Sequence, residues 1–325
     1  MKFATLGHLI TEQTKAQLPP EWFTETMIIS PQIEILGTPG HITGIPLTAR
    51  QMMTLPKHHV RETIYKAAIH LQKALDVDVI QLGGLTTSVT AGGSWLAEQN
   101  GLTAYINHGD SYTAAITCHV INRVLQDLKK KPKDLTLSII GAYGIIGEAV
   151  SKILVPQFQH TTLIGRRKEP FEKLTGTLTG SFDTTTQLEP QHADIIITAT
   201  NHPTALLQSS HIKNNGIVVD VSQPPNLSAD VCAHRPDILR IDGGYVSIAD
   251  KTNIQFPGMP AGMLFACVVE GIMQAMENDC HHHVGSINLT HLQQTETWGQ
   301  KYGFTLQALT NFGQPIQIKG TEHET

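Results

Sequence analysis

Short apolar runs rich in β-branched residues alternate with helix-like segments along most of the chain. Segment 56–75 is the clearest helix, because its apolar residues recur every three or four positions and so share one face. Segment 112–129 repeats that pattern, and the charged, proline-bearing run 129–134 predicts its end. The face of the first helix consists of Val60, Ile64, Ala67, Ala68 and Leu71.

The predicted strands fall into two groups, separated by the helix over 112–129. The first group consists of 26–36 (a strand pair, or one strand broken at Pro31), 77–85 and 102–107. The second group consists of four or five short runs within 135–140, 161–167, 193–201, 216–226 and 238–246. Short buried runs separated by helices or loops are typical of a doubly wound parallel sheet. A last helix is predicted over 258–278, and the tail after Pro315 is polar.

This order predicts an α/β fold with a Rossmann-type domain and a second lobe joined by long helices. We expect an N-terminal α/β lobe for substrate and catalysis over 1–111 and a connecting helix over 112–134. The Rossmann domain is expected over 135–256. A C-terminal helical segment over 257–325 is expected to pack back on the N-terminal lobe.

Composition narrows the class of protein. The chain has 325 residues, enough for two cores, and a formal net charge of −5, which argues against a nucleic-acid footprint. Its four cysteines have no C-x-x-C spacing, so free thiols in a reducing compartment are expected. No run is long and apolar enough to span a membrane, and the N-terminus lacks the apolar stretch of a signal peptide. We therefore expect a cytoplasmic protein.

A glycine loop follows the first strand of the second group. Gly141, Gly144 and Gly147 are spaced G-x-x-G-x-x-G at the head of a helix pattern. Such a turn brings backbone close to a pyrophosphate and directs helix N–H groups at its charge. The alternative is a packing turn with no ligand. The predicted cofactor-binding loop comprises Gly141, Ala142, Tyr143, Gly144, Ile145, Ile146 and Gly147.

The end of the next strand distinguishes NADP from NAD. An acidic residue there would bind the ribose 2′-hydroxyl of NAD, whereas this chain has Arg166 and Arg167. Arginine pairs with a 2′-phosphate, so NADPH is the predicted cofactor. The alternative is a solvated basic cluster at a strand end. Thr200, Gly243 and Gly244 follow later strands and are expected to lie along the cofactor.

Two further features permit more than one interpretation. Cys267 lies in an apolar, helix-like run, and from the run alone it is a buried core residue. The segment 279–285 contains three consecutive histidines, 281–283. Adjacent side chains on a helix or a strand point in different directions, and structural zinc sites use separated pairs of ligands. We therefore predict no metal site.

Seven segments, in order along nearly the whole chain, resemble the cyanobacterial long-chain acyl-[acyl-carrier-protein] reductases that form aldehydes. They are GHLI (7–10), LGGLTTS (82–88), GDSYTAAITCHV (109–120), IIGAYGIIGEAV (139–150), DGGYV (242–246), LFACVVEGIM (264–273) and YGFTLQAL (302–309). The resemblance implies NADPH-dependent reduction of a fatty acyl thioester, on acyl carrier protein or CoA, to the aldehyde. Cys267 matches the family nucleophile, so an acyl-cysteine intermediate is implied. A downstream aldehyde-consuming enzyme is a possible partner.

That chemistry needs a thiolate and groups that stabilise an oxyanion. We expect the pKa of Cys267 to be lowered by a helix N-terminus, a cation or an imidazole, and Cys267 to lie in the first turns of its helix. The candidate oxyanion, proton-donor or substrate-binding residues are Gly83, Gly84, Thr86, Thr87, Ser88, His8 and Tyr112. The alternative for Gly83–Ser88 is a strand-to-helix turn with capping hydroxyls, and for His8 and Tyr112 a purely structural role.

Two other functions fit the same residues. One is an NADP-dependent oxidoreductase of a small carbonyl substrate without covalent catalysis, which would not need Cys267. The other is a non-catalytic NADP(H)-binding sensor that retains the glycine loop. An acyl adduct that forms without NADPH and is absent in Cys267→Ala would distinguish the acyl-thioester reductase from these two alternatives.

Overall fold

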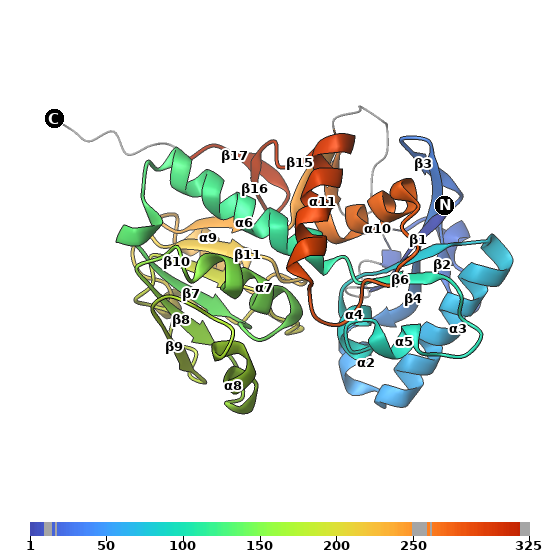
Figure 1. The fold of residues 1–325 in the computed structure, drawn as a ribbon, viewed down its shortest axis with the longest axis horizontal. Coiled ribbons are helices and arrows are strands. Elements are labelled where there is room, and N and C mark those ends of the chain that lie inside the picture. The colour runs from blue at the N-terminus through green and yellow to red at the C-terminus, as the bar shows by residue number, and fades with distance from the viewer. Residues whose placement is uncertain (10–14, 17, 249–258, 261, 319–325) are drawn as a thin grey trace. The chain divides into compact units, whose positions relative to one another are not determined.

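The chain forms two compact units, each built on its own sheet (Figure 1). The computed structural model describes residues 1–9, 15–16, 18–248, 259–260 and 262–318. Unit 1 comprises 1–112 and 248–305, and unit 2 comprises 113–247 and 306–325. The C-terminal segment expected at 257–325 is thus divided, because its last part groups with unit 2.

The sheet of unit 1 is mixed, with strand order β2-β4-β1-β5-β6 and β3 paired to β4. β1, β4, β5 and β6 run parallel, whereas β2 and β3 are antiparallel to β4. The strands are β1 (Phe3–Leu9), β2 (Ile28–Ile29), β3 (Ile33–Ile35), β4 (Thr38–Thr48), β5 (Val79–Leu82) and β6 (Tyr105–Asn107). Residues 26–36 therefore form a strand pair.

The longest helix of unit 1 is the one predicted over 56–75, and the structure confirms it as α3 (Lys57–Leu75). All five residues of its predicted apolar face are buried against the sheet. The other elements of the unit are η1 (Pro20–Trp22), α2 (Ala49–Thr54), α4 (Leu85–Val89), α5 (Ser94–Ala97), β14 (Met263–Phe265), α10 (Ala266–Glu277), α11 (Leu289–Tyr302) and β15 (Phe304–Thr305).

Unit 2 contains a six-stranded parallel sheet of order β12-β11-β10-β7-β8-β9, which is the doubly wound Rossmann arrangement. The predicted α/β class with a Rossmann-type domain and an N-terminal lobe is confirmed. The strands are β7 (Thr136–Ile140), β8 (His160–Ile164), β9 (Phe182–Thr185), β10 (Ile195–Thr198), β11 (Ile217–Asp220) and β12 (Leu239–Asp242). The remaining elements are η2 (Pro132–Asp134), α7 (Ile145–Leu154), α8 (Glu169–Thr175), η3 (Ser209–His211), α9 (Ala229–His234), β13 (Tyr245–Ile248), β16 (Leu309–Asn311) and β17 (Gln314–Ile316).

Two predicted boundaries are wrong. The helix expected over 258–278 begins only at Ala266, because 263–265 form β14; residues 257–258 lie outside the described residues. The helix expected from Tyr112 begins two residues earlier, as α6 (Asp110–Asp127). Strands β1, β4, β9, β15, β16 and β17 were not predicted.

A buried arginine joins the hairpin β16–β17 to the Rossmann sheet. Arg240 on β12 donates hydrogen bonds to Asp220 (3.2 Å), Asp242 (2.8 Å) and Asn311 (3.1 Å), and its side chain is 1% exposed. Its guanidinium also lies 3.8 Å from the centroid of the Phe312 ring. The two carboxylates neutralise a charge that would otherwise be costly to bury.

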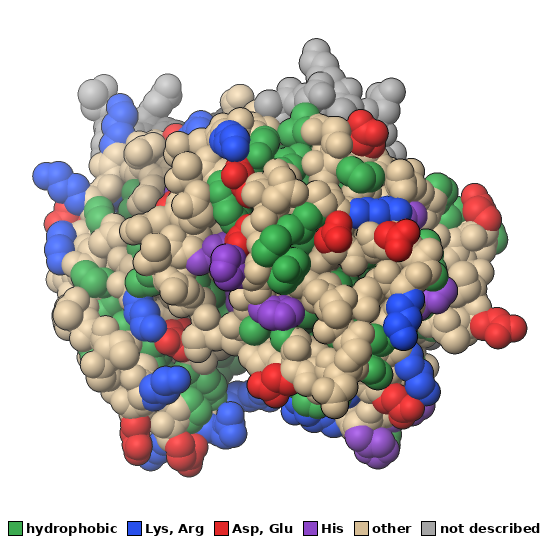
Figure 2. Space-filling model, turned by 45° about the vertical axis from the view of Figure 1, so that its right-hand side comes forward, with side chains coloured by type: hydrophobic (Ala, Val, Ile, Leu, Met, Phe, Trp, Pro, Cys, Tyr) green, Lys and Arg blue, Asp and Glu red, His purple; other side chains and the backbone are tan. Residues whose placement is uncertain are grey.

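The surface shows mixed charge. On the face drawn in Figure 2, basic and acidic side chains of the described residues are interspersed. Among the described residues, no helix is both long and apolar enough to cross a membrane.

Candidate active site

The glycine loop lies at the carboxyl edge of the Rossmann sheet, between β7 and α7. Gly141 has a φ of +85°, which a residue with a side chain rarely adopts. A Cβ on Gly147 would collide with the Gly141 carbonyl oxygen and lie 2.9 Å from its carbonyl carbon. The first turn of α7 therefore packs directly on the loop, as the predicted motif requires.

The N-terminus of α7 fits an anionic group. The first amides of a helix have no acceptor within the helix, and the N-cap residue, Gly144, has no side chain to supply one. The N–H groups of Ile145, Ile146 and Gly147 therefore point out of the loop with the positive end of the helix dipole. The residues present fit the pyrophosphate of a dinucleotide.

Tyr143, in the middle of the loop, reaches the end of β8. Its ring fills the space above Gly165, where a Cβ would collide with it, and its hydroxyl oxygen accepts from the Arg167 N–H at 3.0 Å. An edge-to-face contact with Phe171 holds the ring. Arg166 and Arg167 are exposed, and within the described chain neither guanidinium is paired with a carboxylate. This end of β8 therefore offers two unpaired positive charges.

Thr200, Gly243 and Gly244 lie at the same edge, because they follow parallel strands β10 and β12. A Cβ on Gly141 would lie 3.2 Å from Thr200 Cγ2, so the loop and Thr200 are neighbours. The Thr200 hydroxyl is already engaged, since it donates to Asn226 at 2.6 Å. Gly243 packs against Val221, where a Cβ would lie 2.6 Å from a methyl carbon. Every predicted cofactor-binding residue is thus in unit 2, at one edge of one sheet.

Cys267 lies in unit 1, in the first turn of α10, where we predicted it. It packs against Gly109, just before α6: a Cβ on Gly109 would lie 2.5 Å from both Cα and Cβ of Cys267. Gly109 also has a φ of +72°. A glycine is therefore required on two grounds, and it holds the N-terminus of α6 against the cysteine.

The expectation of a lowered thiol pKa is wrong. Burial, followed by the negative charge of Asp110, raises the pKa of Cys267 to about 12. The N–H of Val268 acts in the opposite direction, as expected at a helix N-terminus. The Val268 N–H lowers the pKa of the thiol by less than burial raises it, because burial disfavours the negatively charged thiolate.

Three titratable side chains lie on the segments that meet at Cys267: Glu270 on α10, and His108 and Asp110 at the start of α6. His108 and Asp110 were missed by the sequence analysis. Glu270 is fully buried, with Oε2 accepting from the Tyr112 N–H (2.7 Å) and Oε1 bonded to His291 Nε2 (3.0 Å). Burial alone would raise the pKa of Glu270, but the hydrogen bond and charge of His291 hold it below its usual range. His108 accepts from the Asp110 N–H at 2.9 Å. Burial lowers the pKa of His108 to about 4, so its imidazole is neutral.

The third side chain, Asp110, is the first residue of α6. Its carboxyl makes no hydrogen bond or ion pair with any residue in the described ranges. Burial, and then the Glu270 carboxylate, raise the pKa of Asp110 to about 8. Asp110 is therefore an unengaged carboxyl next to the thiol.

The other predicted catalytic candidates are engaged in structural hydrogen bonds. His8 accepts from the Leu85 N–H through Nε2 (3.1 Å) and bonds the Leu9 carbonyl through Nδ1 (2.8 Å). The buried Tyr112 hydroxyl donates to the Phe304 carbonyl. Neither side chain has a free group for proton donation in this arrangement.

The Gly83–Ser88 turn has the geometry of the capping alternative. The Thr86 hydroxyl donates to the carbonyls of Leu6 and Gly83, and Thr87 donates to Leu82. The Gly83 N–H is bonded to Leu6, whereas Gly84 (φ +63°) and Ser88 are exposed. Their role as oxyanion donors stays a prediction.

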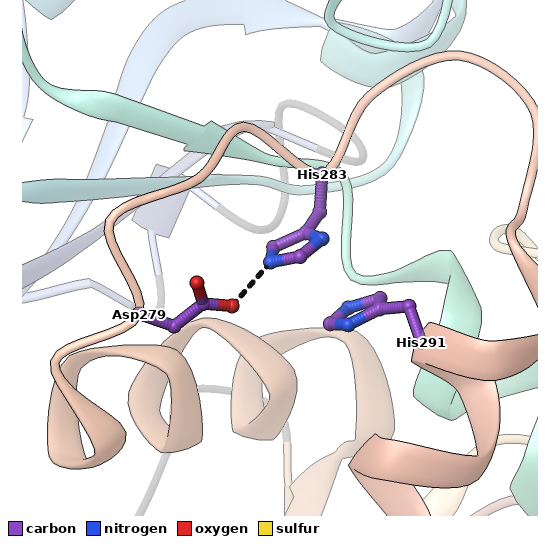
Figure 3. A group of neighbouring side chains, drawn as sticks. All are labelled: Asp279, His283 and His291. Atoms are coloured by element: carbon purple, nitrogen blue, oxygen red, sulfur yellow. Dashed lines mark hydrogen bonds and ion pairs between the residues drawn. The ribbon is translucent and has the colours of Figure 1, made fainter.

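Asp279, His283 and His291 form the group that most resembles a metal site among the described residues (Figure 3). His283 Nε2 bonds Asp279 at 2.7 Å. The two imidazoles are stacked, with ring centroids 3.5 Å apart and planes 5° from parallel. An imidazole binds a metal ion in its own plane, about 2 Å from nitrogen, and two parallel planes this far apart share no such point. The observed arrangement is a stacked pair held by carboxylates.

Comparison with known proteins gives a family match within unit 2 and a curated relative that covers most of the chain. Residues 123–242 match the family model "Shikimate / quinate 5-dehydrogenase". The match covers the Rossmann sheet. The aminotransferase PigE of Serratia sp. (strain ATCC 39006) is 22% identical over 290 residues, which is 85% of this chain and 33% of that protein. The chain thus spans about a third of the length of this curated relative.

Similarity to solved structures is low. L-tryptophan dehydrogenase from Nostoc punctiforme is 10% identical, with 93% of this chain and 80% of that chain covered and a TM-score of 0.43. Shikimate dehydrogenase from Aquifex aeolicus is 13% identical, with 91% and 97% covered and a TM-score of 0.41. The family match agrees with the coarse prediction of an NAD(P)-dependent oxidoreductase. Neither the family match nor the curated relative supports the resemblance to acyl-[acyl-carrier-protein] reductases or an acyl thioester substrate.

Proposed function

We propose that this chain is an NADP(H)-dependent oxidoreductase acting on a carbonyl substrate. The observation that carries the proposal is the carboxyl edge of the Rossmann sheet, where the uncapped N-terminus of α7 lies beside the unpaired Arg166 and Arg167. The match of residues 123–242 to a dehydrogenase family supports the reaction class.

Each part of the edge has a separate task. The amides of Ile145, Ile146 and Gly147 would hold the pyrophosphate, and Arg166 and Arg167 would bind the 2′-phosphate. Bound NADPH supplies a hydride. Tyr143 orients the backbone at Arg167 through its hydrogen bond and so fixes where the second guanidinium begins.

Replacing both Arg166 and Arg167 with alanine is expected to remove the preference for NADPH over NADH. Charge-assisted hydrogen bonds contribute about 1.5–3 kcal/mol each, so NADPH affinity should fall by about tenfold to hundredfold while NADH affinity changes little. Titration calorimetry with both nucleotides measures this. Arg123→Ala, which removes a paired arginine on α6 of the same unit, is the matched control and should leave both affinities unchanged. If the double variant lost the same affinity for NADPH and for NADH, Arg166 and Arg167 would not bind the 2′-phosphate.

A second candidate function is reduction of an acyl thioester, on acyl carrier protein or CoA, through Cys267. The observation that favours it is the position of this cysteine in the first turn of α10, close to the carboxyl groups of Asp110 and Glu270. A simple core cysteine needs no such neighbours. Thiol attack on the acyl carbon would release the carrier thiol and leave an enzyme thioester for reduction to the aldehyde.

Incubation with acyl-CoA in the absence of NADPH tests this second function. We expect a mass increase of one acyl group on the wild-type protein and none on Cys267→Ala. Cys280→Ala, which removes an exposed thiol, is the control and should still be acylated. If both variants reduce simple carbonyl substrates and no adduct forms, the enzyme transfers hydride without a covalent intermediate. If the protein binds NADPH but turns over no substrate, it is a sensor.

A further inference from the structure

Within the described parts of the chain, the carboxyl of Asp110 has no hydrogen bond or ion pair, in contrast to the other titratable groups around Cys267. The carboxyl groups whose charges act on this cysteine are Asp110, at the N-terminus of α6, and Glu270, on α10. His108 lies two residues before Asp110 and interacts electrostatically with Glu270. His291 on α11, and His283 stacked on it, complete the cluster. Each of these except Asp110 has a side-chain hydrogen bond to another described residue.

Histidine is the usual proton acceptor for a cysteine, but neither nearby imidazole is suited to that task. His108 uses Nδ1 to accept the Asp110 N–H, so its single proton is assigned to Nε2 and it has no free acceptor nitrogen. His291 is bound through Nε2 to Glu270, and the charges that act on the Cys267 thiol are those of Asp110 and Glu270 rather than that of His291. Glu270 has both oxygens occupied and is fully buried. Elimination leaves one group.

The close contact between Gly109 and Cys267 fixes where that group lies. Because a Cβ on Gly109 would overlap the cysteine, the residue that follows, Asp110, starts α6 directly beside it. We propose that Asp110 is the acid–base partner of Cys267, taking the thiol proton when the sulfur attacks and returning it to the leaving group. Its raised pKa, about 8, supports this role, because such a carboxyl exchanges protons near neutral pH.

The inference rests on the second candidate function, and the acyl-transfer step balances as follows. The sulfur of Cys267 forms a bond to the acyl carbon while its proton passes to an Asp110 oxygen. The bond between the acyl carbon and the carrier sulfur then breaks, and Asp110 gives the proton to that sulfur. A thiol and a thioester become a new thioester and a new thiol, with no change of oxidation state.

Alkylation with iodoacetamide tests the pairing without any acyl substrate. In this reaction, sulfur forms a bond to carbon, iodide leaves, and the proton passes through Asp110 to solvent. Labelling of Cys267 is followed by peptide mass spectrometry from pH 6 to 10. The wild-type rate should rise with an inflection near the ionisation of Asp110, and in Asp110→Asn the inflection should vanish and the rate at pH 8 fall by about tenfold or more.

Glu270→Gln is the matched comparison, because it also removes a carboxylate near Cys267 but one that is fully hydrogen-bonded. Loss of a negative charge alone eases thiolate formation, so this variant should be labelled as fast as wild type or faster. Faster or unchanged labelling in Asp110→Asn would show that Asp110 acts only through its charge and would overturn the proposal. Asp110→Glu, which keeps a carboxyl, should retain the inflection and guards against a folding defect in the asparagine variant.

Two internal controls and the acylation assay complete the test. Exposed Cys280 should be labelled at the same rate in every variant, and buried Cys118 should stay unlabelled in folded protein. If wild-type protein takes no acyl group but Asp110→Asn still slows alkylation, the acyl-thioester function fails and the pairing stands.

Discussion

Gly147→Ala is expected to abolish measurable NADPH binding at concentrations that saturate the wild type. The new methyl group would meet the Gly141 carbonyl group, and both atoms of that group belong to the backbone of the glycine loop. Overpacking of this kind costs about 1–3 kcal/mol, and here it would push α7 away from the loop whose amides hold the pyrophosphate. The affinity loss should therefore reach about a hundredfold, measured by calorimetry or by nicotinamide fluorescence.

A second glycine in unit 2 provides the control for this change. Gly176 ends α8 with ordinary helical dihedral angles, and a Cβ there would meet nothing closer than 3.7 Å. Gly176→Ala should leave NADPH affinity unchanged. If Gly147→Ala bound NADPH as tightly as wild type, the cofactor would not lie on the N-terminus of α7.

Arg240→Met should lower the free energy of unfolding of the protein by about 3–5 kcal/mol, because it leaves the buried carboxylates of Asp220 and Asp242 without their cation. The hairpin β16–β17 would also lose the guanidinium that contacts Asn311 and Phe312. Urea unfolding followed by circular dichroism measures the loss. The free energy of unfolding of Arg240→Lys should lie between those of the wild type and Arg240→Met, since one ammonium cannot replace the planar guanidinium at both carboxylates.

A surface pair gives the scale for the Arg240 experiment. Arg123 and Asp127 form an exposed i,i+4 pair on α6, and such pairs contribute about 0.3–0.5 kcal/mol. Arg123→Met should therefore change stability little. Equal, small losses in the two methionine variants would mean that the Asp220–Arg240–Asp242 cluster is hydrated and does not hold unit 2 together.

The regular elements were predictable where local pattern and burial coincide. α3 has one apolar face against the sheet, and the strands of unit 2 are short β-branched runs between turns. β1 was missed because Thr5 is its single β-branched residue, unlike the β-branched strands of unit 2. β4 was missed because it contains two prolines and two glycines, residues that disfavour strands. Its Gly40 is explained only by tertiary packing, since the ring of Phe3 fills the space of a Cβ.

The two halves of the candidate site differ in the same way. The glycine loop and the arginines after β8 were found from sequence because their chemistry depends on neighbours within a few residues. The surroundings of Cys267 were not, because Asp110 and His291 come from segments far apart in the chain. The thiol pKa was predicted with the wrong sign for that reason: burial and Asp110 outweigh the helix amides. The local signal was the "HGD" sequence (108–110), which ends on the first residue of α6.

Direct nucleotide binding tests most simply the central claim on which the proposed oxidoreductase function depends, an NADP(H) site on the Rossmann sheet. Purified protein is titrated with NADPH and, separately, with NADH in a calorimeter at one salt concentration. The account predicts saturable binding of one NADPH per chain, tighter than NADH by at least about tenfold because two unpaired arginines follow β8. No binding of either nucleotide, or equal affinity for both, would contradict it.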